Sequence, residues 1–363
     1  MHINTLFKVI YQGKKVLITG HTGFKGSWLA LWLTKLGAEV IGYSLPPPTE
    51  PNHYNLLNLD INSTIADIRD LNKLIEVFQT TQPDIVFHLA AQPIVRLSYQ
   101  EPIETLSANI IGTANVLEAC RKTQSVKAAV MITSDKCYEN KEWIWGYKET
   151  DQMGGYDPYS ASKGCAELVI SSYRNSFFNL KDYGKSHNSL IASTRAGNVI
   201  GGGDWAPDRL MPDIARATSE SKPVIIRNPK STRPWQHVLD PLFGYLLLGS
   251  KLLEGKPEFA DAWNFGPGNE GMLSVIEVSE LFKKSWSDVE FVINHDANAP
   301  HEASMLKLDI SKANYRLNWK PVWETARGIS ATAEWYKEYY QNGKIITEKQ
   351  LGQFCEDIER LGF

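Results

Sequence analysis

The sequence predicts an α/β protein with a Rossmann-type, doubly wound parallel sheet and a smaller mixed α/β domain for substrate. Three observations lead to this prediction. Apolar segments of strand type alternate with helical segments through the first half of the chain, a glycine-rich segment follows the first strand, and the alternation is lost after Asn198. Apolar strands separated by helices are typical of a parallel sheet that helices cover on both faces.

The first elements follow from local patterns. Residues 15–20 form an apolar β-type segment, and a helical pattern begins at Ser27 and ends before Gly37, a residue type that favours the position after a helix. Residues 38–43 form the next expected strand. Four prolines predict that residues 45–58 are a loop: Pro46, Pro47, Pro48 and Pro51.

The later elements continue the alternation up to Asn198 and then change character. The glycines of residues 201–203 predict a loop, which opens the smaller domain. We expect further strands at residues 60–67, 84–91, 127–133, 189–196 and 289–293, and further helices at residues 71–80, 104–123, 158–178 and 275–286.

Composition limits the class of protein. The chain has 363 residues, 38 basic and 41 acidic, for a net charge of −3, and 43% of its residues are hydrophobic. This apolar content excludes a disordered chain, and the near-neutral charge argues against broad nucleic-acid binding. The longest apolar stretch, residues 241–253, is interrupted by Gly244 and Lys251 and is too short to span a bilayer.

The cysteines predict the compartment. Four cysteines in a chain of this length, without Cys-x-x-Cys spacing, indicate neither a disulfide scaffold nor a zinc site, so we expect no metal and a cytoplasmic location. Residues 1–15 lack the basic segment and long apolar core of a signal peptide. The cysteines are Cys120, Cys137, Cys165 and Cys355.

A candidate phosphate-binding loop joins the first strand to the first helix. It contains Gly20, Gly23 and Gly26. Glycines let the backbone turn sharply and approach a pyrophosphate, and the start of a helix offers free N–H groups and a positive dipole end. The position directly after an N-terminal strand favours a dinucleotide site over the alternative, a tight turn without a ligand.

The segments after the second and third strands bear on the choice of dinucleotide. An acidic residue after the second strand would bind the ribose of NAD, but Tyr43 and Ser44 stand there. The ribose contact is therefore unassigned, and the lack of a following arginine favours NAD over NADP. Asp67 and Ile68, which close the third strand, either contact the edge of the adenine ring or form an ordinary turn.

A tyrosine and a lysine share one helix face. Asp157 and Pro158 are a favourable helix start, and Tyr159 and Lys163 then lie four residues apart. A nearby ammonium group lowers the pKa of a phenol, which would make Tyr159 a general base toward a sugar hydroxyl. The alternative is an amphipathic helix face with no chemistry.

Further polar residues follow strands whose carboxyl ends face the ligand crevice of such a sheet. Ser134, Asp135 and Lys136 follow one strand; they offer a hydrogen-bonding hydroxyl, an acid and a base, or only an exposed turn. Arginines near the later strand ends are suited to bidentate binding of a substrate pyrophosphate, and each could instead form a surface salt bridge. These arginines are Arg195, Arg209 and Arg233.

Together these motifs resemble the extended short-chain dehydrogenase/reductase family, and within it the nucleotide-sugar 4,6-dehydratases, over about residues 12–340. The segments most similar to the branch that acts on CDP-glucose are residues 19–29, 133–138, 201–205 and 300–303. The family motifs are Thr-Gly-x-x-Gly-Phe-x-Gly at residues 19–26, His-Leu-Ala-Ala at residues 88–91, Asn109-x-x-Gly112-Thr113, Tyr159-x-x-x-Lys163 and Arg195-x-x-Asn198.

The resemblance implies roles for these residues. Tyr159 would take the proton of the sugar 4-hydroxyl with Ser134, Lys163 would order the nicotinamide ribose, Asp135 would protonate the departing 6-hydroxyl, and Lys136 would remove the C5 proton. In dehydratases for dTDP- and GDP-sugars the last residue is glutamate, so Lys136 is a departure that also marks the CDP-glucose branch. The resemblance implies NAD contacts at Gly20, Gly23, Phe24, Gly26, Asp67, Ile68, Ala90, Ala91, Tyr159 and Lys163. It implies CDP-glucose contacts at Gln92, Ser134, Asn198, Arg209 and Arg233.

The resemblance also implies a domain division and an oligomer. Residues 1–196 and 236–266 would form the NAD-binding Rossmann domain, and residues 197–235 and 267–363 the nucleotide-sugar-binding domain. Members of the family usually pair helices across a dimer interface, so we expect a homodimer or a dimer of dimers, with no nucleic-acid or membrane partner.

Three other functions remain open from the residues. A nucleotide-sugar 4-epimerase would use the same glycine loop, Tyr159 and Lys163, but it needs no acid and base after Ser134. A non-catalytic NAD-binding regulator would be expected to lose Tyr159 or Lys163. A scaffold protein would use the fold only for contacts. Asp135 and Lys136 are therefore the features that favour a dehydratase.

Overall fold

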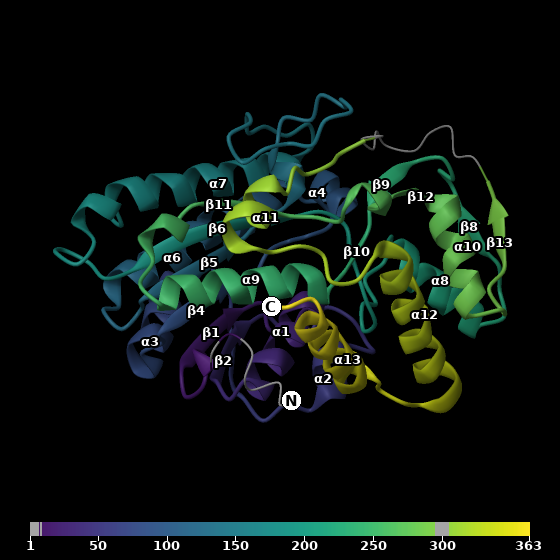
Figure 1. Cartoon of the computed structure of the whole chain (residues 1–363), viewed down its shortest axis with the longest axis horizontal. Coiled ribbons are helices and arrows are strands. Elements are labelled where there is room, and N and C mark those ends of the chain that lie inside the picture. The colour runs from purple at the N-terminus through teal and green to yellow at the C-terminus, as the bar shows by residue number, and fades with distance from the viewer. Residues whose placement is uncertain (1–6, 8, 295–304) are drawn as a thin grey trace.

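The computed structural model describes residue 7, residues 9–294 and residues 305–363. In this part of the chain the central element is a seven-stranded sheet in which every pair of neighbours is parallel. Figure 1 shows the sheet between two helical layers. In spatial order its strands are β11 (Ala262–Phe265), β6 (Leu190–Ala196), β5 (Ala128–Ile132), β4 (Ile85–His88), β1 (Lys15–Thr19), β2 (Glu39–Ser44) and β3 (Asn62–Ile65). The predicted doubly wound fold is confirmed.

Alternate residues of the strands bury opposite faces of the sheet, as the pleat requires. Val16 and Ile18 of β1 belong to one hydrophobic core and Leu17 to another. The first core also contains side chains of α1 (Phe24–Lys35), α9 (Leu239–Leu253) and α13 (Thr347–Arg360). The second core contains side chains of α3 (Leu71–Thr81), α6 (Gly112–Lys122) and α7 (Pro158–Ser176).

The smaller part of the molecule lies beyond the carboxyl end of β6. Figure 1 shows it on the right, with α8, α10 and α12 beside short strands. Its pairs are β7 (Val199–Ile200) with β10 (Gln236–His237), β9 (Thr232–Pro234) with β12 (Met272–Ser274), and β8 (Val224–Ile226) with β13 (Phe291–Ile293), and its helices are α8 (Leu210–Ser219), α10 (Val275–Ser285) and α12 (Thr325–Asn342). The helix α11 (Ser311–Leu317) instead contacts β11 of the main sheet.

The packing of the C-terminus bears on the domain division. The Phe354 ring of α13 lies edge-on to Trp32 of α1, with ring centroids 5.7 Å apart, and Phe363 contacts Phe243 of α9 at 5.0 Å. The last helix therefore packs on the dinucleotide-binding half, although the sequence boundaries assign residues 267–363 to the other domain. The exact division remains a prediction.

Two local expectations were wrong. Residues 45–58 are not wholly a loop, because α2 (His53–Leu57) forms where Asn52 accepts a hydrogen bond from the backbone of Asn55. The expected helix at residues 104–123 is divided into α5 (Pro102–Leu106), a π-helical turn η2 (Ser107–Ile111) and α6. The irregular turn carries Asn109, whose amide donates to Ser162 on α7 at 2.8 Å.

The apolar stretch at residues 241–253 lies in α9, which is buried against the sheet. Among the described residues, no helix is both long and apolar enough to cross a membrane. The four cysteines, all of which lie in the described ranges, are free thiols.

Candidate active site

The turn after β1 depends on two glycines that pack the backbone against itself. Gly20 has φ +79°, a conformation that L side chains rarely adopt, and a Cβ there would lie 2.7 Å from the Ala90 nitrogen. A Cβ on Gly26 would lie 2.1 Å from the Gly20 carbonyl oxygen. Both glycines therefore allow α1 and the segment after β4 to approach the turn closely.

Gly23 is different, because it keeps the start of α1 open. A Cβ there would find the Gly20 oxygen at 3.4 Å as its nearest neighbour. Gly23 occupies the N-cap, so the first N–H groups of α1 and the positive end of the helix dipole face this space. The Phe24 ring points toward Gly201, where a Cβ would lie 3.2 Å from its tip, so Phe24 offers a ligand its backbone N–H. This cradle fits the diphosphate of a dinucleotide.

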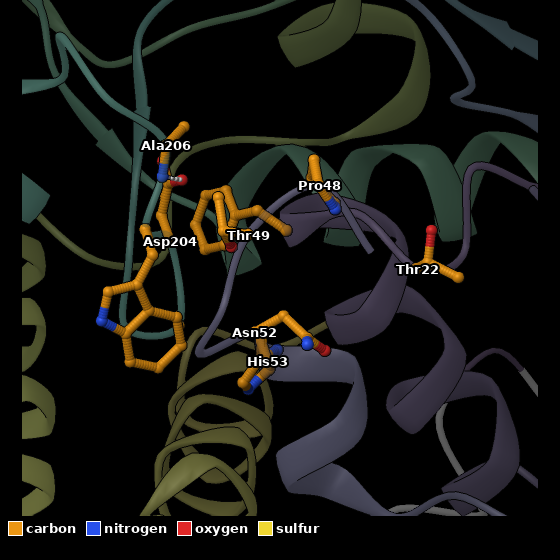
Figure 2. A pocket seen from close by; sticks show the side chains of 10 residues that line it. Thr22, Pro48, Thr49, Asn52, His53, Asp204 and Ala206 are labelled. Atoms are coloured by element: carbon orange, nitrogen blue, oxygen red, sulfur yellow. Dashed lines mark hydrogen bonds between the residues drawn. The ribbon is translucent and has the colours of Figure 1, made fainter. Parts of the chain in front are cut away.

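Hydroxyl groups line the end of β2. Thr22 donates to the Leu45 carbonyl at 2.9 Å, and its oxygen lies 2.8 Å from the Ser44 hydroxyl. A small pocket opens beside Thr22, between the proline-containing loop and the loop after β7 (Figure 2). Ser44 is a candidate for the ribose contact that the sequence left unassigned. The other side chains around the pocket are Phe24, Pro48, Thr49, Asn52, His53, Asp204, Trp205 and Ala206.

Asp67 and Ile68, the two residues predicted to contact adenine, already contact other residues of the chain. Arg69 holds the Asp67 carboxylate, with its Nε 3.0 Å from both oxygens, and this hydrogen bonding keeps the pKa of Asp67 below its usual value. Ile68 is buried and packs where a Cβ on Gly112 would lie, 2.4 Å from its Cδ1. Their contact with adenine remains a prediction.

Gln92 has a structural use that sequence analysis did not anticipate. Its side-chain nitrogen donates to the Ile94 carbonyl at 3.1 Å and to the Thr105 hydroxyl at 2.7 Å, and its side-chain oxygen accepts from the Ile94 N–H. Asn109 accepts from the Gln92 backbone at 2.8 Å. Gln92 therefore fixes the loop that contains Ala90 and Ala91, which argues against its amide as a substrate ligand.

Asp135, the predicted acid, lies just after the carboxyl end of β5. Ser134 caps the 3-10 turn η3 (Asp135–Cys137) and donates to the Asp135 carboxylate at 2.9 Å. Burial raises the pKa of Asp135, against the opposing effects of Lys136, Ser134 and Lys25. A raised pKa favours the protonated form, which a general acid needs. Lys136 follows it and is half-buried.

The predicted helix start and helix face both form. Asp157 caps α7 by accepting from the Ser160 N–H at 2.9 Å, Pro158 is the first helical residue, and Tyr159 and Lys163 are both buried. The Lys163 Nζ lies 5.9 Å from the centre of the Tyr159 ring.

The expected low pKa of Tyr159 was wrong for this structure. Burial raises the pKa of Tyr159 to about 12, because the phenolate is desolvated more strongly than its neighbours stabilise it. The groups that oppose burial are the hydroxyl of Ser134, by hydrogen bonding, and the positive charge of Arg209. Burial also lowers the pKa of Lys163, to about 8.

Sequence analysis missed one cation. Lys25, in the first turn of α1, has its pKa lowered to about 8 by burial and by the charges of Arg209 and Lys163, while Asp135 raises it. The charge of Lys25 therefore interacts with the charges of Asp135, Arg209 and Lys163. The available signal was its position inside the glycine-rich segment.

The remaining arginines differ in environment. Arg209 donates to Asp204 at 2.7 Å, and its charge acts on Tyr159, so it lies at the site. Arg233 donates to the Thr232 carbonyl at 2.9 Å. Arg195 is fully buried in an ion pair with Glu167 at 2.8 Å, so its expected role in binding a pyrophosphate was wrong.

Of the other predicted substrate contacts, Asn198 is half-buried in the loop after β6, and its carbonyl accepts from the Gln236 N–H at 3.2 Å. The segment at residues 300–303, which carried part of the resemblance, lies outside the described residues.

The parallel sheet, the glycine turn after β1, Ser134 after β5 and the Tyr159–Lys163 face of α7 define an extended short-chain dehydrogenase/reductase. Within this class the chain belongs to the family described as GDP-mannose 4,6 dehydratase, whose model matches residues 17–332.

Curated relatives agree with this membership. The chain is 52% identical to the CDP-glucose 4,6-dehydratase of Salmonella typhimurium, over 97% of this chain and 99% of the relative. It is 28% identical to the dTDP-glucose 4,6-dehydratase of the same organism, over 95% and 98%.

Solved structures agree in fold. An epimerase from Methanothermobacter thermautotrophicus is similar with a TM-score of 0.79 and 25% identity, over 96% of this chain and 97% of the other. A UDP-glucose 4-epimerase from Thermotoga maritima gives a TM-score of 0.75 at 22% identity, over 89% and 99%, which supports the fold alone.

Proposed function

We propose that this protein is an NAD-dependent CDP-glucose 4,6-dehydratase, which converts CDP-glucose to CDP-4-dehydro-6-deoxyglucose and water. The observation that carries the proposal is the buried group of Ser134, Asp135 and Tyr159, with Lys136 next in the chain. An epimerase needs the tyrosine but no acid and base for elimination. The 52% identity to a CDP-glucose 4,6-dehydratase over nearly the whole of both chains supports the choice of substrate.

The start of α1 would hold the diphosphate of NAD, and Lys163 its nicotinamide ribose. NAD, when bound, supplies the acceptor and donor of the hydride that leaves C4 and returns to C6. Tyr159 removes the proton of the 4-hydroxyl, while Ser134 holds the same oxygen. The pKa of about 12 already includes the opposing positive charge of Arg209, so Tyr159 holds its proton in this structure and would need a further positive charge beside the phenolate to act as a base.

The elimination falls to the residues after β5. A ketone at C4 acidifies the C5 hydrogen, which Lys136 would remove. Asp135, whose pKa burial raises, would give its proton to the departing 6-hydroxyl, so that water leaves. The substrate diphosphate would meet Arg209, Arg233 and Asn198.

The route of one hydrogen tests this function. CDP-glucose deuterated at C4 should give a product that carries deuterium at C6 and a solvent proton at C5. An epimerase would return the deuterium to C4, and a simple dehydrogenase would lose it from the sugar. Parallel reactions with dTDP-glucose and GDP-mannose test the nucleotide, and faster turnover of either would overturn the assignment of CDP-glucose.

We also propose a homodimer and a cytoplasmic location. α5, η2 and α6 pack against α7, and Figure 1 shows α6 beside α7. This layer exposes three large apolar side chains. Ile103 is 76% exposed, Ile111 53% and Leu168 60%, and an interface between two copies on this layer would bury them. The free thiols fit a reducing compartment. Light scattering of the wild type and of Leu168→Lys tests the interface; a monomeric wild type would contradict it.

A further inference from the structure

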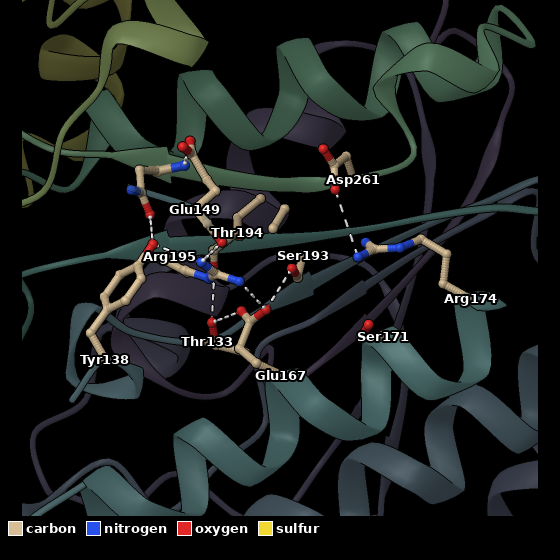
Figure 3. A network of polar contacts seen from close by, with 12 residues as sticks. Thr133, Tyr138, Glu149, Glu167, Ser171, Arg174, Ser193, Thr194, Arg195 and Asp261 are labelled. Carbon is tan, nitrogen blue, oxygen red and sulfur yellow. Dashed lines mark hydrogen bonds and ion pairs between the residues drawn. The ribbon is translucent and has the colours of Figure 1, made fainter. Parts of the chain in front are cut away.

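The carboxylate of Glu167 takes no part in the proposed chemistry. With its three partners, Thr133, Ser193 and Arg195, it forms a buried polar junction between α7 and the sheet. Glu167 lies one turn after Lys163 on α7, and Figure 3 shows its carboxylate between the helix and the sheet. It accepts hydrogen bonds from the Thr133 hydroxyl at 2.5 Å and the Ser193 hydroxyl at 2.8 Å. It also forms an ion pair with Arg195 at 2.8 Å. Two of these partners, Ser193 and Arg195, lie on β6, and Thr133 directly follows the neighbouring strand β5.

The junction stays charged inside the protein. Glu167 and Arg195 each expose only 4% of their side chains. Burial raises the pKa of Glu167, but the charge of Arg195 and the hydrogen bonds from Arg195, Thr133 and Ser193 together outweigh burial, so its pKa lies below the usual value. A buried pair of this kind is weak support for stability, because the cost of desolvating both charges is large. Its retention needs another explanation, such as the precision with which it places its neighbours.

The far side of Arg195 extends the junction to the loop after β5. Its Nη1 donates to the Tyr138 hydroxyl at 2.6 Å and to the Glu149 carbonyl at 3.1 Å. Tyr138 in turn donates to Asn264 on β11 at 2.8 Å. Glu167 and Arg195 therefore tie α7, β5, β6 and β11 together through hydrogen bonds of fixed direction.

The neighbours of this junction are the proposed catalytic groups. Thr133 directly precedes Ser134 and Asp135, and Glu167 follows Lys163 by one helical turn. A movement of the Glu167 carboxylate would shift α7 relative to the end of β5. An error of about 1 Å in such a placement can reduce a rate about 100-fold.

We propose that Glu167 is the positioning residue of this active site, because its carboxylate fastens the helix that carries Tyr159 and Lys163 to the strand end that carries Ser134 and Asp135. This inference rests on the proposed function. Glu167 acts through Thr133 and Arg195 and does not itself touch the substrate.

The same carboxylate acts on the charge of Lys163. The titratable groups around Lys163 are Cys137 of η3, His88 of β4, Lys25 of α1, and Glu167 of α7 itself, and the Tyr159 ring lies beside it. Cys137 and Glu167 raise the pKa of Lys163 against the stronger effect of burial, but burial raises the pKa of the Cys137 thiol well above its usual value, so Glu167 is the one that carries a negative charge at neutral pH. Removal of the Glu167 charge therefore lowers the pH at which Lys163 loses its proton.

The test compares Glu167→Gln with a matched control on the same helix. Gln keeps the size of the side chain but removes the charge. We expect kcat with CDP-glucose and NAD to fall at least 10-fold, KM to change less than 3-fold, and the Lys163 titration to move below the wild-type pH of about 8. The titration is followed by NMR of protein labelled with ¹³C at lysine Cε and assigned with Lys163→Met.

Arg174→Met is the control. Arg174 lies on α7 two turns after Glu167 and pairs with Asp261 at the edge of the sheet, 3.7 Å away. Its loss should lower Tm without a change in kcat or in the Lys163 titration. Thr133→Val is a milder second variant, which removes one hydrogen bond to Glu167; it should reduce kcat about 3- to 10-fold and leave the titration unchanged.

Equal kcat in Glu167→Gln and wild type, or a loss no larger than that of Arg174→Met at a similar fall in Tm, would overturn the proposal. If Glu167→Gln does not fold, an unchanged kcat in Thr133→Val would overturn it instead. A wild type that fails to turn over CDP-glucose would refute the proposed function, whereas the NMR titration would still test the effect of Glu167 on Lys163.

Discussion

Gly23 caps α1 and Gly26 lies in its first turn, and we predict that their replacement by alanine has opposite consequences. A Cβ on Gly26 would lie 2.1 Å from the Gly20 oxygen and 2.8 Å from the His21 Cα. These contacts are too close for real atoms, so α1 must move away from the turn. Overpacking of this kind costs roughly 1–3 kcal/mol of folding free energy, and Gly26→Ala should lower Tm by several degrees.

A Cβ on Gly23 has room, because its nearest neighbour would be 3.4 Å away. Its backbone, φ −78° and ψ 170°, is also favourable for alanine. The loss of a good N-cap residue costs at most about 1 kcal/mol, so Tm should hardly change. The methyl group would instead occupy the space through which a diphosphate reaches the first N–H groups of α1.

The loss of one hydrogen bond to a charged group costs about 1.5–3 kcal/mol, which predicts NAD binding about 10- to 100-fold weaker in Gly23→Ala. The assay is a calorimetric NAD titration beside a thermal melt of each variant without cofactor. Gly23→Ala that binds NAD as tightly as wild type would refute the assignment of this cradle. An unchanged Tm in Gly26→Ala would refute the packing argument.

Three further outcomes are expected. Lys136→Ala should leave CDP-glucose binding intact but slow elimination about 10²- to 10⁴-fold, as measured by turnover beside a binding titration; near-normal turnover would make Lys136 a surface residue. Tyr159→Phe should slow loss of deuterium from C4 by a similar factor, and an unchanged rate would place the base elsewhere. The lowered pKa of Lys163, about 8, penalises its charged form at pH 7, and the penalty fades as the pH rises from 8 toward the unfolded value of 10.5. Lys163→Met should therefore stabilise the protein by up to about 3 kcal/mol at pH 7 and less at pH 10 in denaturant titrations; equal effects at both pH values would contradict this.

Local sequence patterns determined the elements that depend on near neighbours. The glycine spacing after β1 and the Asp157-Pro158 helix start both formed as expected, because a turn or an N-cap is decided by a few adjacent residues. The alternation of apolar strands and helices likewise determined the sheet, since residues buried on both faces need covering layers.

Tertiary contacts decided what depends on residues distant in the chain. From the sequence we expected Arg195, near a strand end, to be available for a ligand. In the structure Glu167 of α7 forms an ion pair with it. The division of the helix at residues 104–123 follows contacts of Asn109 with Gln92 and α7. Neither partner can be identified from local spacing.

Charge states also depended on the folded structure. The spacing of Tyr159 and Lys163 predicted their shared face, but the sequence does not give burial, which raises the pKa of one and lowers that of the other. Lys25 is a similar case. Its position in the glycine-rich segment is visible in the sequence, but its charge interacts with Asp135 only once α1 has packed against the sheet. Desolvation and distant charges are properties of the packed molecule, and they set the chemistry of the residues that the motifs located.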